Sequence, residues 1–163
     1  FKKVWAGFDT KNKSLIAWNE VDTNNLLDEK RLENEILLLS NLDHPSILKL
    51  KDYWINSSKY TLITEIFNNN TLDNYYKNNN KKDTLKKLTI QILNGIEYIH
   101  NNNIIHRDIK PENIGINNND IKIMDFGLST KYLTPKKSRT LKRAQTISQK
   151  DFQLFSPLSS HFP

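Results

Sequence analysis

The spacing of apolar residues changes several times along the chain, and each change marks a boundary between predicted elements. Alternating or short continuous apolar runs predict strands, whereas apolar residues three and four positions apart predict helices. The predicted strands cover residues 1–7, 15–21, 47–54, 60–66 and 121–124, with shorter apolar runs at 104–105 and 114–116. The predicted helices cover residues 28–42 and about 84–101. The expected order is therefore strands, one helix, strands, a long helix and short strands.

Each predicted helix has an apolar stripe that is expected to be its buried face. In the first helix, Leu32, Ile36 and Leu39 lie at helical spacing, and Asp28 is the expected N-terminal cap. The stripe of the second helix consists of Leu85, Leu88, Ile92, Ile96 and Ile99.

Runs of asparagine separate the predicted elements. They cover residues 68–70, 78–80, 101–103 and 117–119. Such low-complexity insertions are best tolerated in surface loops, so they support the proposed boundaries. After Leu133 the periodicity disappears, and residues 134–163 are predicted to be a mostly irregular, basic tail rich in Ser and Thr.

Composition restricts the class of protein only modestly. The formal net charge is +6, but much of the excess lies between Lys131 and Lys150, where a charge run is typical of a solvated segment. With no binding face that combines aromatic and basic residues, a nucleic-acid partner is the least favoured reading. The chain has no cysteine, which excludes disulfides and thiolate metal sites and favours a cytoplasmic location. No apolar run reaches the length of a membrane span, about 20 residues.

Two motifs carry most of the functional information. The first is His106-Arg107-Asp108-Ile109-Lys110-Pro111-Glu112-Asn113, and the second is Asp125-Phe126-Gly127. Together they resemble the catalytic loop and the metal-binding motif of eukaryotic protein kinases. A chance match of this length and spacing is very improbable.

The resemblance implies an α+β, bilobal protein-kinase-like fold. Residues 1–67 would form the small lobe, an antiparallel sheet with one helix, together with the hinge. Residues 68–133 would begin the helical large lobe, and 134–163 would be the irregular tail or an aberrant activation segment. A glycine-rich phosphate loop would precede Phe1, so we expect the 163-residue chain to be catalytically incomplete by itself.

The resemblance also assigns roles in phosphoryl transfer from ATP to a protein serine or threonine. Asp108 would orient the substrate hydroxyl and accept its proton, and Lys110 would reach the transferred phosphate. Asn113 and Asp125 would hold Mg²⁺ through oxygen ligands. Glu35, on the first predicted helix, would anchor the lysine that grips the ATP phosphates.

Further residues would line the nucleotide site. Val4 and Ala17 would contact adenine from above. Thr64 would be the gatekeeper at the start of the hinge, where backbone groups of Glu65 and Phe67 would bind adenine.

The lysine expected in the third kinase strand is replaced by Asn19, and an amide cannot replace an ammonium group beside phosphates. Side chains alternate between the two faces of a strand, so Lys2 has the same parity as Val4, whereas Lys3 points away. Lys2 is therefore predicted to enter the ATP cleft from the neighbouring strand.

A relocated lysine resembles the with-no-lysine (WNK) family of serine/threonine kinases. The likeness covers about residues 1–133 and includes Phe1 to Thr10, Ala17-Trp18-Asn19-Glu20, His44-Pro45-Ser46-Ile47 and Asp52-Tyr53-Trp54. One departure is Gly115, which occupies the floor of the adenine pocket, where a large apolar side chain is usual. Thr146 and Ser148 are candidate phosphosites, with a disordered basic tail as the favoured alternative.

Two alternatives stay open at this point. Asn19 and Gly115 favour a pseudokinase that acts as a scaffold. A kinase related to those that phosphorylate a translation initiation factor would share the region around Asp52 and the sequence after Asp125, but such kinases normally keep the third-strand lysine.

Overall fold

The computed structural model describes residues 2–23, 25–56, 59–67, 70–78, 82–117, 119–132 and 152–157. The candidate phosphosites Thr146 and Ser148 lie outside these ranges. Within them, no helix is both long enough and apolar enough to cross a lipid bilayer.

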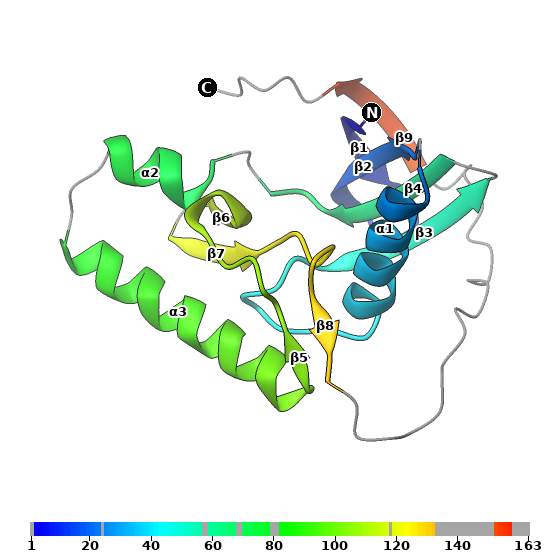
Figure 1. Cartoon of the computed structure of the whole chain (residues 1–163). Helices are drawn as coiled ribbons and strands as arrows, with labels where there is room; N and C mark the ends of the chain where they lie inside the picture. The colour runs from blue at the N-terminus through cyan, green and yellow to red at the C-terminus, as the bar shows by residue number, and fades with distance from the viewer. Residues whose placement is uncertain are drawn as a thin grey trace.

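A five-stranded antiparallel sheet forms one half of the molecule (Figure 1). Its strand order is β3-β4-β2-β1-β9. The strands are β1 (Lys2–Asp9), β2 (Ser14–Asp22), β3 (Leu50–Asn56), β4 (Lys59–Glu65) and β9 (Phe152–Pro157). The buried carboxylate of Asp9 closes the turn between β1 and β2, because it accepts hydrogen bonds from the backbone N–H groups of Lys11 and Asn12.

One helix, α1 (Leu26–Leu39), packs against this sheet. Leu32 and Ile36 are buried together with Tyr60 and Leu62 of β4. The helix begins earlier than predicted, because Asn25 rather than Asp28 is the cap: its side chain accepts from the N–H groups of residues 27 and 28. Asp28 instead lies in the first turn, where its negative charge interacts favourably with the positive end of the helix dipole.

The other half of the molecule begins with two helices and continues through short strands and a 3₁₀ turn. These elements are α2 (Leu72–Asn78), α3 (Lys82–Asn101), β5 (Ile104–Ile105), η1 (Pro111–Asn113), β6 (Ile114–Asn117), β7 (Asp120–Ile123) and β8 (Thr130–Lys131). Helix α2 was not predicted, because its seven residues between two asparagine runs are too few to show a repeating apolar stripe. The predicted stripe of α3 faces the core, since Leu88 and Ile99 are buried.

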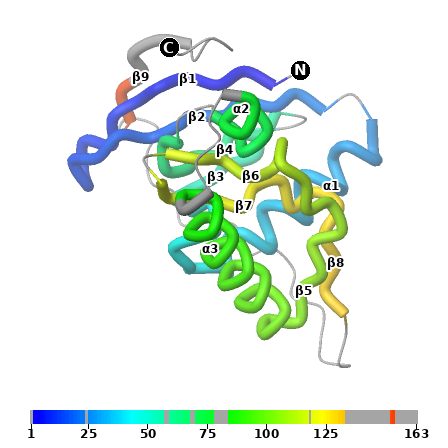
Figure 2. The backbone as a smooth tube through the Cα atoms, turned by 90° about the vertical axis from the view of Figure 1, so that its left-hand side faces the viewer, coloured from blue at the N-terminus to red at the C-terminus, as the bar shows by residue number. Residues whose placement is uncertain are grey.

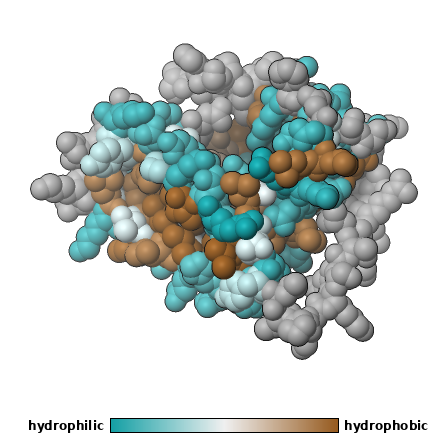
Figure 3. Space-filling model, in the orientation of Figure 1, coloured by the Kyte–Doolittle hydropathy of each residue, from teal (hydrophilic) through white to brown (hydrophobic). Residues whose placement is uncertain are grey.

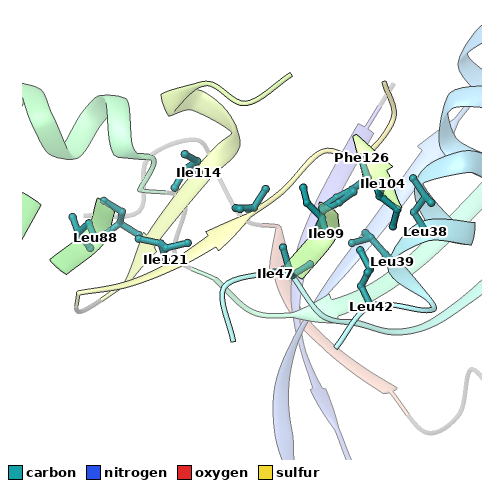
Figure 4. Close-up of a cluster of buried hydrophobic side chains, with 12 residues drawn as sticks. Leu38, Leu39, Leu42, Ile47, Leu88, Ile99, Ile104, Ile114, Ile121 and Phe126 are labelled. Atoms are coloured by element: carbon teal, nitrogen blue, oxygen red, sulfur yellow. The ribbon is translucent and has the colours of Figure 1, made fainter. Parts of the chain in front are cut away.

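The largest buried cluster joins the two halves (Figure 4). Phe126, which is 0% exposed, lies in this cluster with residues from α1, α3 and the β6–β7 hairpin. On the outside, apolar side chains gather over the α3 side of the molecule (Figure 3). The exposed apolar residues of α3 are Ile90 and Leu93. The predicted α+β fold, with an antiparallel small-lobe sheet, one helix and the start of a helical lobe, is confirmed.

Strand β9 lies within residues 134–163, which were predicted to be mostly irregular, and no strand was predicted there. This strand pairs antiparallel with β1, from Trp5 to Asp9, and covers the outer edge of the sheet (Figures 1 and 2). Phe152 anchors it on the sheet face that carries Trp18 and Trp54, with ring centroids 6.0 Å from each. The six-residue strand was missed because its pairing partner is more than 140 residues away, and no local pattern records such a contact.

The register of β9 is open to a direct test. Phe8 and Gln153 are paired across β1 and β9, and directly opposed Cβ atoms lie about 4.5–5.5 Å apart in such pairs. Because the chain has no cysteine, the double substitution Phe8→Cys/Gln153→Cys should form one disulfide under mild oxidation. Non-reducing gel electrophoresis and peptide mapping would detect the crosslink.

The matched control is Lys3→Cys/Gln153→Cys. Lys3 lies five positions along β1, about 16 Å away at 3.3 Å per residue. Equal crosslinking of the two variants would contradict the register and show that the segment samples many positions.

Candidate active site

A cavity of about 710 Å³ lies between the sheet, α1, the hinge and the segment 124–128. Every residue predicted to bind the nucleotide or metal lines it, and so does Glu35. These residues are Lys2, Val4, Ala17, Glu35, Thr64, Glu65, Phe67, Asn113 and Asp125. Asp108 and Lys110 are not among the lining residues. Asp108 joins the site by accepting a hydrogen bond from Asn113, and Lys110 donates to Asp108.

The structure separates the two lysines of β1 as strand parity predicts. Lys2 lines the cavity, as does Val4 two positions on, whereas Lys3 does not. Val4 is paired directly with Asn19 across β1 and β2. Lys2 therefore lines the cavity from the strand beside the position where the kinase lysine is missing.

Asn19 is held within the sheet. Its Nδ2 donates to the carbonyl oxygens of Ala17 and Leu62, both at 3.2 Å, and more weakly to Oγ1 of Thr64 at 3.4 Å. The side chain is buried, and its donors are used by the protein itself. An amide fixed in this way stabilises the strand pairing and carries no charge for a phosphate.

Glu35 connects helix α1 with Lys2 and with the Asp-Phe-Gly segment. Burial raises the pKa of the Glu35 carboxyl above its usual range, while the positive charge of Lys2 opposes this shift and the negative charge of Asp125 adds to it. A hydrogen bond from the backbone of Phe126 also favours the ionised form. Lys2 and Glu35 interact electrostatically, although no direct ion pair between these two described residues is formed.

One turn of α1 also fixes the backbone that follows Asp125. Nδ2 of Asn34 donates to the carbonyl oxygens of Phe126, at 3.3 Å, and Ser129, at 2.8 Å. Glu35 and Asn34 are neighbours in sequence, so a shift of α1 moves both contacts together. Sequence reasoning did not identify Asn34, because a polar helix residue gives no signal of a partner more than 90 positions away.

The catalytic loop is organised around Asp108. Its Oδ2 accepts from Nζ of Lys110 at 2.7 Å and from Nδ2 of Asn113 at 2.8 Å. The hydrogen bond from Lys110, followed by that from Asn113, lowers the pKa of the Asp108 carboxyl. Asp108 is therefore ionised at neutral pH and able to accept a proton or orient a hydroxyl.

The side chain of His106 fixes the backbone of this loop through hydrogen bonds. The backbone N–H of Asp108 donates to Nδ1 of His106 at 3.3 Å, so Nε2 carries the proton and donates to the carbonyl of Met124 at 3.1 Å. The imidazole also meets the ring of Phe126 edge to face, with centroids 4.7 Å apart. Burial lowers the pKa of His106, which keeps the ring neutral and able to accept from Asp108.

The predicted magnesium ligands fit a hard cation. Asn113 uses Nδ2 for Asp108, at both its carbonyl and its carboxylate, so Oδ1 is the atom left for a metal. Asp125 is exposed toward the cavity and has a left-handed backbone conformation, with φ 62°. Magnesium is bound in proteins by one or two such oxygen ligands together with phosphate and water.

The hinge is held by an ion pair that the sequence did not predict. Oε1 of Glu65 lies 2.7 Å from Nζ of Lys122 on β7 and accepts from the backbone N–H of Lys49 at 2.8 Å. The Glu65 side chain thus joins the hinge to the large-lobe hairpin, and its predicted contribution to adenine binding would come from the backbone. Lys122 is the polar position between Ile121 and Ile123 of β7, and only the tertiary fold brings it to Glu65.

Comparisons with known proteins agree with this geometry. The chain matches the protein kinase domain family over residues 1–149, and it belongs to that family. It is similar to the probable serine/threonine-protein kinase WNK6 of Oryza sativa subsp. japonica, with 38% identity over 141 residues, and to the serine/threonine-protein kinase WNK8 of Arabidopsis thaliana, with 37% over 142 residues. These matches cover 78% and 80% of this chain but only 32% and 25% of the two relatives. The resemblance to WNK kinases is confirmed.

The buried histidine predicts a specific pH dependence of stability. As pH falls through about 6.5, His106 takes up a proton in the unfolded chain before it does so in the folded chain, because its folded pKa is lowered. Protonation therefore favours unfolding, and the free energy of unfolding should fall as pH falls through this window. Urea denaturation at pH 7.5 and pH 6.0 would measure the change.

The comparison variant is His106→Gln, which has no proton to gain in this range. It should lose less stability between the two pH values than the unsubstituted chain does. If both chains lose the same free energy of unfolding between the two pH values, His106 does not contribute to the acid sensitivity.

Proposed function

We propose that this chain is the nucleotide-binding and catalytic-loop part of a serine/threonine protein kinase, which transfers the γ-phosphate of ATP to a protein hydroxyl. The observation that carries the proposal is the position of Lys2, which lines the same cavity as Glu35, Asn113 and Asp125. A charged lysine at this point supplies what Asn19 lacks.

Each residue has a role in the proposed reaction that follows from its surroundings. Lys2 neutralises the phosphates of ATP, and Glu35 keeps that lysine directed toward them. Asp108 orients the substrate hydroxyl and accepts its proton, for which its lowered pKa keeps it ionised. Lys110, now bonded to Asp108, turns toward the transferred phosphate when the nucleotide is present.

Magnesium fits this scheme through Oδ1 of Asn113 and the carboxylate of Asp125. When bound, it would neutralise charge on the phosphates. The pair is supported by its common cavity and by the use of Nδ2 of Asn113 elsewhere.

The organisation of the chain follows from the same proposal. Residues 1–67 act as the small lobe and hinge, and 68–133 as the beginning of the large lobe. The relatives named above are serine/threonine kinases, which supports a protein serine or threonine as the acceptor. The absence of cysteine is compatible with a cytoplasmic location.

The decisive test compares two neighbouring lysines. In the complete gene product, Lys2→Ala should abolish phosphoryl transfer, because the ATP phosphates lose their ammonium partner, whereas Lys3→Ala should leave most of it. Transfer of radiolabelled phosphate from ATP to a generic protein substrate would measure both. Equal activities of the two variants would refute the role of Lys2.

A second substitution tests the kinase proposal independently of Lys2. Asp108→Asn removes the charge and the proton acceptor with little change in shape, so it should abolish transfer while Mg·ATP binding remains. Full activity in this variant would exclude the proposed catalytic loop.

The pseudokinase alternative is supported by one observation, the hydrogen bonds that fix Asn19 within the sheet. It predicts that the unsubstituted gene product transfers no phosphate, whether or not it binds nucleotide. Turnover that depends on Lys2 and Asp108 would eliminate it.

A further inference from the structure

Gly115 on β6 leaves a space that another residue fills. A Cβ atom added to Gly115 would lie 2.6 Å from Cδ1 and 2.7 Å from Cε1 of Phe67, and 3.3 Å from Cε of Met124. The first two distances are far shorter than real contacts, and the atoms concerned belong to a rigid ring. The ring of Phe67 therefore lies directly against the backbone of Gly115, where a larger residue would place its own side chain.

The pairing of β6 with β7 explains why the ring comes to this point. Gly115 is paired with Lys122, and the side chains of directly paired residues lie on the same face of an antiparallel hairpin. Both positions of this face meet the hinge, because Lys122 binds Glu65 at 2.7 Å and Gly115 receives Phe67. The chain just after the hinge adds to the same hairpin, since Thr71 bridges Gly115 and Ile116 donates to the carbonyl of Asn70 at 2.7 Å.

We infer that Phe67 forms the floor of the nucleobase subsite, in place of the side chain missing at residue 115. The inference rests on the proposed function, since it concerns the nucleotide that the kinase reaction requires. Phe67 and Met124 line the same cavity as Val4 and Ala17 of the sheet. A planar purine held between these two sets of side chains stacks on an aromatic ring rather than on an aliphatic floor.

The sizes of the two residues are thus exchanged: the large side chain is that of Phe67 at the hinge, and the small residue is Gly115 on the hairpin. Base–aromatic contacts of this kind contribute substantially to affinity in other nucleotide sites. Without the ring, Gly115 would leave a hole beneath the base. With a larger residue 115, the ring would be forced out of its position.

The exchange is tested with three variants of the complete gene product, Phe67→Ala, Gly115→Leu and the double variant, by titration calorimetry with Mg·ADP. Each single variant should bind more weakly, by roughly five- to a hundredfold for loss of the ring. The double variant should recover most of the lost affinity, because leucine then occupies the space that the ring has left. Phe8→Ala, which removes the same ring from β1 outside the cavity, should bind like the unsubstituted chain.

A second ligand separates contact with the base from general damage to the fold. Phe67→Ala should weaken binding of adenosine by the same factor as ADP, since the floor contacts only the base. Lys2→Ala should weaken ADP and leave adenosine unchanged. Thermal unfolding of every variant verifies the fold, and Phe67→Leu replaces Phe67→Ala if the latter does not fold, with a smaller expected loss.

The outcomes distinguish this inference from the proposed function. If the unsubstituted chain binds Mg·ADP and Phe67→Ala binds it equally well, the inference falls and the proposed function stands. The inference also falls if the double variant binds no better than Gly115→Leu. If the unsubstituted gene product binds neither ADP nor adenosine, the proposed function falls and the inference falls with it.

Discussion

The burial of the Phe126 ring is the contact on which the arrangement of the site depends. The ring is fully buried in the cluster that joins α1, α3 and the β6–β7 hairpin (Figure 4). On one side it meets His106, which supports Asp108. Its backbone is bound by Asn34 and Glu35 of α1, and Asp125 precedes it in the chain. One apolar side chain thus sets the positions of Asp108, the proposed proton acceptor, of Asp125, a proposed magnesium ligand, and of Glu35, which interacts electrostatically with Lys2.

The residues of the site could be identified from the sequence to the extent that their signals are local. The catalytic loop is a continuous motif, and the placement of Lys2 follows from the two-residue period of a strand, which holds in any sheet with one buried face. Most elements were also predicted, because their apolar positions repeat. The start of α1 was misplaced by a few residues, since Asn25 and Asp28 are both good caps and only the folded backbone selects one.

The contacts that were missed all join positions far apart in sequence. Asn34, Lys122 and the strand β9 owe their roles to partners on other elements, and nothing in their own segments indicates those partners. Gly115 is the clearest case. Considered alone, it suggested a defective adenine pocket, but the structure shows that a hinge residue fills the space beside it. A small residue at a site is therefore informative only together with the neighbour that meets it.

The pairing of β9 with β1 has a consequence for how the chain folds while it is being synthesised. Strand β1, which carries Lys2, is synthesised before the other strands of this sheet, and β2 can pair with one of its edges almost at once. Its other edge receives β9 only after more than 140 further residues have been added, on the order of ten seconds later at ordinary rates of translation. During that interval the nascent chain exposes an unpaired strand edge beside the tryptophans of the outer sheet face, the kind of surface that molecular chaperones bind and that other chains can extend.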